Sequence, residues 1–203
     1  MRVYDAPFPG TRGSRLRWLL EEIGVSYELS PVNLRAGEHR SAEYLKIHPH
    51  GVVPAFELDG VTLVESAAVC LQLADLHPEA GLAPPVGSAA RALYYQWIVY
   101  APATLDDQLV ARAFHTAFLP EDRRDPAVVA KADKVWGAAA PFLSSALGDN
   151  PWLLGEAFSA ADVVIGYDIQ LASRQGLLDE RPTLAAYFER LRARPAYQRV
   201  FQS

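Results

Sequence analysis

The feature that most constrains the fold of this chain is a β-hairpin pattern centred on Asp59-Gly60. Apolar and polar residues alternate over residues 56–58 before this dipeptide and over residues 61–63 after it. Asp-Gly is a preferred two-residue connection because both positions tolerate the positive φ angles of a tight hairpin turn. The sequence therefore predicts two short antiparallel strands, and with them a sheet in the first part of the chain.

The residues on either side of the hairpin alternate between strand and helix patterns. Alternation and helical spacing predict strands at 3–4 and 26–32, and helices at 12–23, 41–46 and 66–76. Ser66 is the residue type that caps a helix, and it is expected to cap the last of these. The order β-α-β-α-β-β-α predicts a small, mixed four-stranded α/β sheet with helices packed on it.

Beyond residue 87 the apolar residues recur only with helical spacing. A proline-containing linker is expected over 78–87, with helices at 88–114, at 126–147, from 159 onward and around 184–191. Ser159 and Asp162 have the spacing of a capping box, in which each side chain accepts a hydrogen bond from the backbone of the other residue. We therefore expect an α/β domain over 1–77 and an all-helical domain over 88–203.

Composition excludes several classes of function. The 203 residues have a formal net charge of −5 and no run of like charge, which argues against a nucleic-acid-binding protein. The single cysteine, Cys70, excludes an internal disulfide and a multi-cysteine zinc site, and no metal is expected. Neither a signal-peptide core nor a bilayer-length apolar run is present, so a cytoplasmic protein without membrane contact is expected.

Residues 10–14, which precede the first helix, are suited to a small anionic ligand. The N-terminus of a helix presents unpaired N–H groups and a partial positive charge. Thr11 and Ser14 add hydroxyl donors at this end. The alternative is that one of these two residues is only the N-cap of the helix.

Two further segments flank the hairpin. A cis peptide bond at Val53–Pro54 would turn the N–H and C=O of Val53 outward, where an extended peptide can pair as an added strand. Glu65–Ser66 begins the next helix, where a carboxylate accepts from an ammonium and helix N–H groups donate to a carboxylate. That combination matches the zwitterionic end of an amino acid, although plain helix capping also accounts for the pair.

In their order and spacing, these segments make the chain resemble a cytosolic-type glutathione transferase from end to end. The resemblance rests on TRGSRLRWLLEEIGVSYE, IHPHGVVPAFELDGVTLVESAAV and NPWLLGEAFSAADVVIGYD. It implies a thioredoxin-like N-terminal domain and an all-helical C-terminal domain. At the first helix the chain is similar to bacterial, theta-like members of the serine or threonine type.

The resemblance also implies which residues bind the co-substrate glutathione. Pro54 would be the family's cis-proline, and the main chain of Val53 would bind the cysteinyl backbone of glutathione. Glu65–Ser66 would hold the γ-glutamyl end. His39 would lie near the glycine carboxylate, with His50 as a second candidate for that contact.

The residue that would ionise the glutathione sulfur departs from the family's usual pattern. The positions at which other members have a catalytic tyrosine, serine or cysteine hold Ala6, Gly10 and Arg12. Many bacterial members instead have a hydroxyl residue at the start of the first helix. On this resemblance Thr11 is the first choice for the activating hydroxyl and Ser14 the second.

A single hydroxyl supplies enough stabilisation for this role. A free thiol has a pKa of about 8.5, so a thiolate at neutral pH requires about two units of lowering, or about 2.7 kcal/mol. A hydrogen bond to a charged group contributes about 1.5–3 kcal/mol. A helix N-terminus adds about 0.3–1 kcal/mol. Thr11 and the first helix therefore suffice, and a backbone N–H could replace the hydroxyl.

The position of the cysteine separates reaction classes within the family. Members that use cysteine form mixed disulfides, whereas Cys70 falls inside an apolar helix. We therefore predict a glutathione thiolate that attacks a small apolar electrophile, with reduction of an organic peroxide as a further activity. The electrophile pocket is expected between the domains, at Tyr94, Trp97 and Ile98. The resemblance also implies a homodimer.

A different class of function stays open at this point. The chain could be a non-catalytic glutathione-binding or protein-interaction member of the same fold, because the tyrosine, serine and cysteine of the standard positions are absent. An isomerase of the maleylacetoacetate type fits less well, since the S-S-C-S motif of those members is missing. The sequence identifies neither the electrophile nor the balance between conjugation and peroxide reduction.

Overall fold

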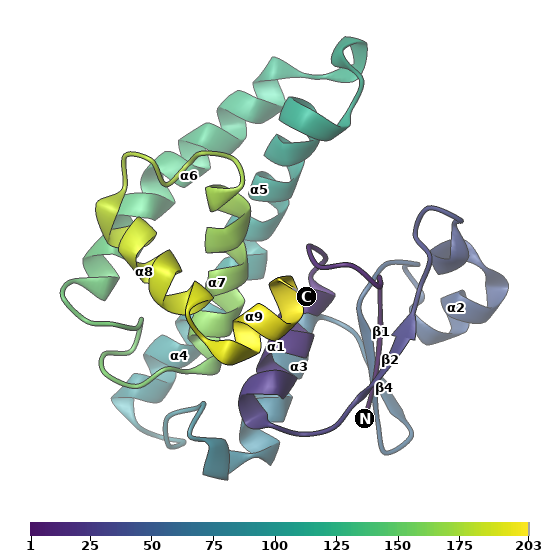
Figure 1. Cartoon of the computed structure of the whole chain (residues 1–203), viewed down its shortest axis with the longest axis horizontal. Coiled ribbons are helices and arrows are strands. Elements are labelled where there is room, and N and C mark those ends of the chain that lie inside the picture. Colours follow the sequence, from purple (N-terminus) through teal and green to yellow (C-terminus); the bar gives the residue numbers. More distant parts are fainter. Residues whose placement is uncertain (203) are drawn as a thin grey trace. The chain divides into compact units, whose positions relative to one another are not determined.

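A computed structural model describes residues 1–202, which form two compact units (Figure 1). Unit 1 contains Met1–Ala83 and the C-terminal segment that begins at Arg192, and unit 2 is Pro84–Leu191. The division falls inside the linker expected over 78–87. The sequence predicted a single helical domain from 88 to the C-terminus. The structure differs from this prediction, because the segment that begins at Arg192 belongs to unit 1.

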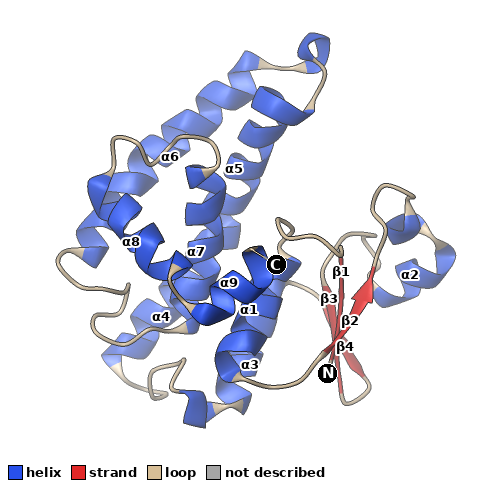
Figure 2. Cartoon of the chain, in the orientation of Figure 1, coloured by secondary structure: helices blue, strands red, loops and turns tan. Residues whose placement is uncertain are grey.

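The strands lie in unit 1, where they form a four-stranded sheet in the order β2-β1-β3-β4 (Figure 2). They are β1 (Arg2–Asp5), β2 (Glu28–Pro31), β3 (Ala55–Leu58) and β4 (Val61–Leu63). β1 runs parallel to β2 and antiparallel to β3, and β3 pairs antiparallel with β4. The mixed sheet expected from the sequence is thereby confirmed.

The hairpin turn joins β3 to β4 at the predicted dipeptide. Leu58 pairs with Val61, so only Asp59 and Gly60 lie between the paired residues. Both have positive φ angles, +49° for Asp59 and +79° for Gly60. These angles are those of the turn that the right-handed twist of two strands favours.

Two helices pack against each other and cover one side of the sheet. They are α1 (Gly13–Ile23) and α3 (Ser66–Leu76), and Figure 1 shows α2 (Ala42–Ile47) on the other side of the sheet. The side chains of Leu16, Leu19 and Leu20 are fully buried, as the spacing on α1 predicts. α1 ends at Gly24, whose φ of +81° is readily adopted by glycine.

Neither the cap expected for α3 nor the alternative cap considered for α1 is present. The N-cap position of α1 is Arg12, without a side-chain capping bond, so neither Thr11 nor Ser14 caps the helix. The N-cap position of α3 is Glu65, also without a capping bond, and Ser66 is the first helical residue. The prediction that Ser66 caps α3 was therefore wrong, and its hydroxyl is not used for capping.

A short C-terminal helix, α9 (Pro195–Phe201), was not predicted from the sequence and belongs to unit 1. It packs on α1, where the rings of Trp18 and Tyr197 meet edge to face with centroids 5.1 Å apart. Just before α9, the Arg194 guanidinium binds both Glu22 carboxylate oxygens at 2.6 and 2.7 Å. These contacts attach the end of the chain to the first helix.

Unit 2 begins with a long helical segment that is interrupted twice. α4 (Ala89–Tyr100) and α5 (Asp106–Ala113) are separated by a π-helical turn at Ala101–Leu105, and a second π-helical turn covers Phe114–Phe118. The helix expected over 88–114 is therefore present as a continuous helical segment, but it contains a π-helical turn and is not one regular α-helix. Pro102 lies inside the first π-helical turn, and a proline cannot donate the N–H that continues a regular helix.

The remaining helices of unit 2 follow the sequence predictions closely. They are α6 (Pro126–Leu147), α7 (Ala160–Ser173) and α8 (Pro182–Arg192). The capping box at the start of α7 is present as predicted, with Asp162 accepting from the backbone N–H of Ser159 at 2.9 Å. Within residues 1–202, no helix is both long enough and apolar enough to cross a membrane.

Candidate functional site

The starts of α1 and α3 meet in the interior of unit 1. Arg15, in the first turn of α1, is fully buried, and its Nη1 donates to the Ser66 hydroxyl oxygen at 3.3 Å. Ser66 is the first residue of α3 and is 6 % exposed. Two helix N-termini, each with the partial positive charge of a helix start, therefore converge on one region.

The β1–α1 loop gives Thr11 a partner that the sequence did not suggest. Its hydroxyl donates to Oδ1 of Asp5, the last residue of β1, at 2.5 Å. Thr11 is partly exposed, whereas Asp5 is fully buried. Ser14 is also buried, and its oxygen accepts from the Gly10 N–H at 3.1 Å. Of the two hydroxyl residues expected near the sulfur, only Thr11 combines solvent access with a charged partner.

Asp5 is an ionisable group held in an apolar, tightly packed position. Burial raises the pKa of Asp5 to about 6, although hydrogen bonds from Thr11 and the Ala6 backbone and the charge of Arg17 favour the carboxylate. A Cβ atom on Gly13 would lie 2.2 Å from the Asp5 Cγ, so only glycine allows α1 to start this close to the carboxylate. The sequence offered one indication that Asp5 matters, namely that it is an acidic residue directly after the strand predicted at 3–4.

The Val53–Pro54 peptide bond is cis, which confirms the expectation from the family resemblance. Tyr4 pairs with Ala55 in the antiparallel pair of β1 and β3. Asp5 follows Tyr4 and Pro54 precedes Ala55, so Asp5 and Pro54 lie next to each other in register. No hydrogen bond connects the N–H or C=O of Val53 to another residue in the described part of the chain. These two groups are therefore available to pair with an extended peptide.

Glu65, which precedes α3, has a backbone conformation that its side chain disfavours. Its φ of +70° is uncommon for a non-glycine residue, and its side chain is exposed. Such conformations occur where the surroundings hold them in place, often at ligand sites. The sequence signalled the charge of Glu65 but not this geometry.

Two side chains from the α2 region hold the segment that leads to Val53. Arg40 Nη1 donates to the His50 carbonyl oxygen at 3.0 Å, and the Tyr44 hydroxyl donates to the Val52 carbonyl oxygen at 2.8 Å. Burial raises the pKa of Tyr44 to about 12, so the hydroxyl keeps its proton and remains a donor at neutral pH. Neither residue was predicted to contribute to the site.

The backbone of His39 packs directly against this segment. A Cβ atom on Gly51 would lie 2.6 Å from the His39 carbonyl oxygen, and the φ of Gly51 is +58°. Glycine is therefore required for this approach. The side chain of His39 is partly buried and that of His50 is exposed.

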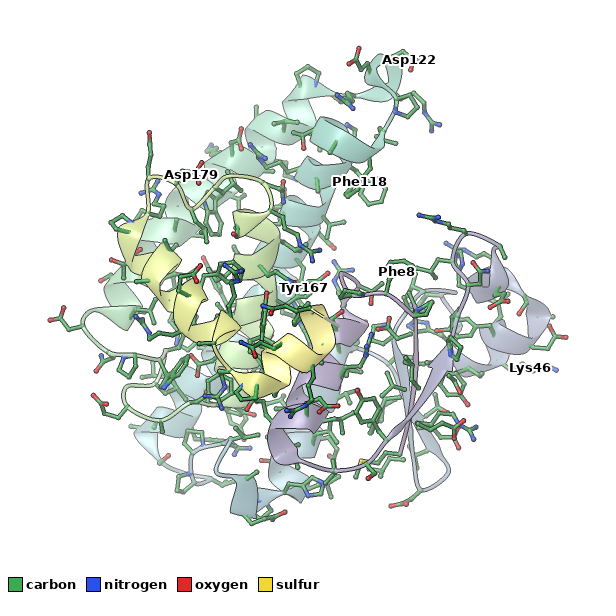
Figure 3. All side chains as sticks on the ribbon, in the orientation of Figure 1. Phe8, Lys46, Phe118, Asp122, Tyr167 and Asp179 are labelled. Carbon is green, nitrogen blue, oxygen red and sulfur yellow. The ribbon has the colours of Figure 1, made fainter. Side chains whose placement is uncertain are left out.

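A cavity of about 680 Å³ opens beside the β1–α1 loop. Pro7, Phe8, Pro31 and Leu34 form its apolar lining, and Asn33, Arg35 and Glu38 complete it. Figure 3 shows Phe8 on the loop that follows β1, and its side chain is 47 % exposed. The cavity has the size and largely apolar lining of a small-molecule site. Sequence reasoning did not find it.

The remaining candidate residues lie in the interior. Burial raises the pKa of Cys70 to about 12, so this thiol is neither reachable nor ionised at neutral pH. Tyr94, Trp97 and Ile98 lie on α4 with side chains no more than 3 % exposed, and their contact with an electrophile stays a prediction. Among residues 1–202, no group of three or more His, Cys, Asp or Glu side chains is arranged to hold a metal ion.

Comparison with known proteins gives consistent matches over nearly the whole chain. The N-terminal domain model of glutathione S-transferases matches residues 1–75, and the C-terminal domain model matches residues 107–195. Glutathione S-transferase GstA of Escherichia coli O157:H7 is 29 % identical over 199 residues, which cover 94 % of this chain and 92 % of GstA.

A plant enzyme and a solved bacterial structure extend the comparison. Glutathione S-transferase F13 of Arabidopsis thaliana is 28 % identical over 194 residues, or 92 % of this chain and 89 % of F13. A glutathione transferase family member from Pseudomonas fluorescens, solved with two glutathione molecules bound, superposes with a TM-score of 0.85. It is 25 % identical, and the match covers 98 % of this chain and 90 % of that one.

Proposed function

Because this chain belongs to the glutathione S-transferase family, we propose that it binds glutathione on unit 1 and uses the ionised sulfur to attack a small apolar electrophile. The observation that carries this proposal is the unpaired backbone of Val53 beside Pro54. An extended peptide that pairs with Val53 would lie close to the end of β1. The loop that follows β1 holds Thr11, which is hydrogen-bonded to Asp5. Relatives with glutathione bound support the same ligand.

The two ends of the tripeptide find complementary groups. The exposed Glu65 carboxylate accepts from the γ-glutamyl ammonium, while the Ser66 hydroxyl and the N–H groups of α3 donate to the γ-glutamyl carboxylate. His39 is the first candidate to contact the glycine carboxylate, and His50 is the second. Thr11 faces the thiol, as in the theta-like members of the serine or threonine type.

Replacing Tyr44 with phenylalanine is expected to raise the KM for glutathione about fivefold and to change kcat by less than about twofold. The hydroxyl bond to the Val52 carbonyl oxygen positions the strand to which the tripeptide pairs, and such a bond contributes about 1 kcal/mol. Tyr27→Phe is the matched control, because the Tyr27 hydroxyl contacts Glu21 instead. An unchanged KM in Y44F, measured by initial rates, would show that this bond does not position the site.

Replacing Glu65 with glutamine is expected to weaken glutathione binding about tenfold, because a charge-assisted hydrogen bond to the ammonium is lost. The matched ligand control is a glutathione analogue that lacks the γ-glutamyl amino group. This analogue is expected to bind the E65Q variant and the parent protein with the same affinity. Calorimetry on both ligands gives the comparison, and equal losses for the two ligands would exclude the ammonium contact.

The acceptor chemistry follows from the apolar surfaces near the thiol. The cavity beside Pro7 and Phe8 accommodates the apolar body of an electrophile. The same thiolate can reduce an organic peroxide, in which two glutathione thiols give the disulfide, an alcohol and water. Buried Cys70 leaves the chain without a thiol for mixed-disulfide chemistry. A cytoplasmic homodimer is part of this proposal.

A direct test combines binding with turnover. Calorimetry is expected to show glutathione binding, and the protein is expected to conjugate glutathione to an activated aryl halide. Binding without turnover of aryl halides, epoxides or organic peroxides would favour the non-catalytic alternative. Dehydroascorbate reduction at rates that match conjugation, or no binding at all, would overturn the proposal.

A further inference from the structure

We propose that Asp5 is a positioning residue that takes up the thiol proton of glutathione through Thr11. The inference rests on the proposed function. As glutathione binds, the S–H bond breaks and its proton bonds to Thr11 Oγ1, while the proton that Thr11 already carries moves to Asp5 Oδ1. The products are a thiolate, a neutral Thr11 hydroxyl and a neutral Asp5 carboxylic acid, so one negative charge moves from Asp5 to sulfur.

The geometry connects the buried Asp5 carboxylate to the protein surface through Thr11. Thr11 Oγ1 donates to Asp5 Oδ1 at 2.5 Å, a separation typical of a hydroxyl bound to a carboxylate. Asp5 has no exposed surface, and its Oδ2 has no hydrogen-bond partner among residues 1–202. Thr11 is partly exposed, so it offers a route from the carboxylate to a ligand at the surface.

The hydrogen bond from Thr11 to Asp5 favours the relay, because it occupies the only proton of the hydroxyl. While Asp5 is ionised, the only proton on the Thr11 hydroxyl is donated to Asp5, and that hydroxyl can accept from a thiol but cannot donate to a thiolate. When the proton lies on Asp5, the acid donates to Thr11 and the hydroxyl donates to sulfur. The thiolate therefore gains its hydrogen bond only when Asp5 is neutral.

Electrostatics favours a single proton shared by the two acids. Two negative charges about 6 Å apart near a protein surface disfavour each other about a hundredfold in equilibrium constant. A thiolate bound to Thr11 and an ionised Asp5 would be such a pair. Either group alone can carry the charge, which is the behaviour of acids that titrate as a coupled pair.

The surroundings of Asp5 contain few groups that compete for this proton. Arg17 from α1 favours the carboxylate, and the protonated Tyr44 hydroxyl from α2 is the other ionisable group that interacts with Asp5. Burial opposes both effects and raises the pKa of Asp5 to about 6, which brings its acidity nearer to that of a thiol. The close start of α1 at Gly13 keeps the carboxylate packed against protein.

The test counts protons released for each thiolate formed. Reduced glutathione is titrated into the protein at pH 7 in buffers of low and high ionisation enthalpy, and the thiolate is measured in parallel by its ultraviolet absorption. The relay predicts thiolate formation with no more than about 0.2 protons released per thiolate, because Asp5 retains the proton. In the Asp5→Asn and Thr11→Val variants, the thiolate that forms is expected to release about one proton each.

Asp59→Asn is the matched control, because it makes the same chemical change at the hairpin turn, and it is expected to release protons like the parent protein. Release of about one proton per thiolate by the parent would overturn the relay and leave the proposed function standing. Binding without any thiolate would also overturn it. Absence of glutathione binding would instead contradict the proposed function itself.

Discussion

Replacing Asp162 with alanine is expected to lower the free energy of unfolding of unit 2 by about 3–5 kcal/mol, which is enough to unfold many domains at physiological temperature. The Asp162 carboxylate is fully buried at the start of α7. It accepts from the Leu153 and Ser159 N–H groups at 2.9 Å, from the Ser159 hydroxyl at 3.1 Å and from the Tyr187 hydroxyl at 2.9 Å.

The size of this effect follows from the donors that the substitution would leave behind. Each buried donor without a partner costs about 1–3 kcal/mol, whereas loss of one hydrogen bond to a carboxylate costs about 1.5–3 kcal/mol. Tyr187→Phe removes one of the four bonds and keeps the carboxylate, so it is the matched control with a smaller expected loss of about 1.5–3 kcal/mol. Urea unfolding followed by far-ultraviolet circular dichroism gives both values. Similar losses in the two variants would contradict this account of Asp162.

At pH 8 the free energy of unfolding of the Asp5→Asn variant is expected to be about 2–3 kcal/mol higher than that of the parent protein, so the variant is more stable. Burial raises the pKa of Asp5 from 3.8 to about 6, so ionisation of this group costs stability in the folded state. A shift of this size corresponds to about 3 kcal/mol. Asparagine carries no charge and still accepts from Thr11, so it removes most of that cost.

The pH dependence of this gain has a definite sign. Between about pH 4 and pH 6 the folded state binds more protons at Asp5 than the unfolded state, so the contribution of Asp5 to stability falls as the pH rises through this window. Below pH 4 both states hold a neutral Asp5, and the gain from Asp5→Asn is expected to vanish. Asp59→Asn, at the exposed hairpin turn, is expected to leave the stability unchanged at both pH values. A destabilised Asp5→Asn variant at pH 8 would contradict the account.

A buried carboxylate that lowers stability is consistent with a functional role. Substitutions that improve stability are common at positions where a site imposes strain or charge. Asp5 therefore links the stability of unit 1 to its chemistry, because the same charge that destabilises the fold is the charge that the relay would move to sulfur.

Local patterns predicted the elements whose geometry is set by neighbouring residues. The Asp59-Gly60 turn and the capping box at Ser159 and Asp162 each depend on contacts within a few positions, and both are present. The π-helical turn at Pro102 was missed because helical spacing alone does not reveal where a long helix loses its regular bonds. α9 was missed because seven residues carry too short a pattern, and its position depends on contacts with Trp18 far away in the sequence.

In the candidate site, too, neighbouring residues predicted some features, whereas contacts between distant residues determined others. Residue types and spacing proposed Thr11, Val53, Glu65 and Ser66 as candidates, but did not predict the hydrogen bonds around them. The bond from Thr11 to Asp5 and the bond from Tyr44 to the Val52 carbonyl oxygen connect elements that only the folded sheet brings together. The positive φ of Glu65 and the missing cap at Ser66 likewise depend on packing that no single-sequence pattern encodes.

The central claim is that this protein ionises the glutathione thiol at the start of α1. Its most direct test is a pH titration of the thiolate absorption of glutathione bound to the protein. The account predicts that half of the bound thiol is ionised near pH 6.5, about two units below a free thiol. A bound thiol that titrates near pH 8.5, as glutathione does in solution, would contradict it.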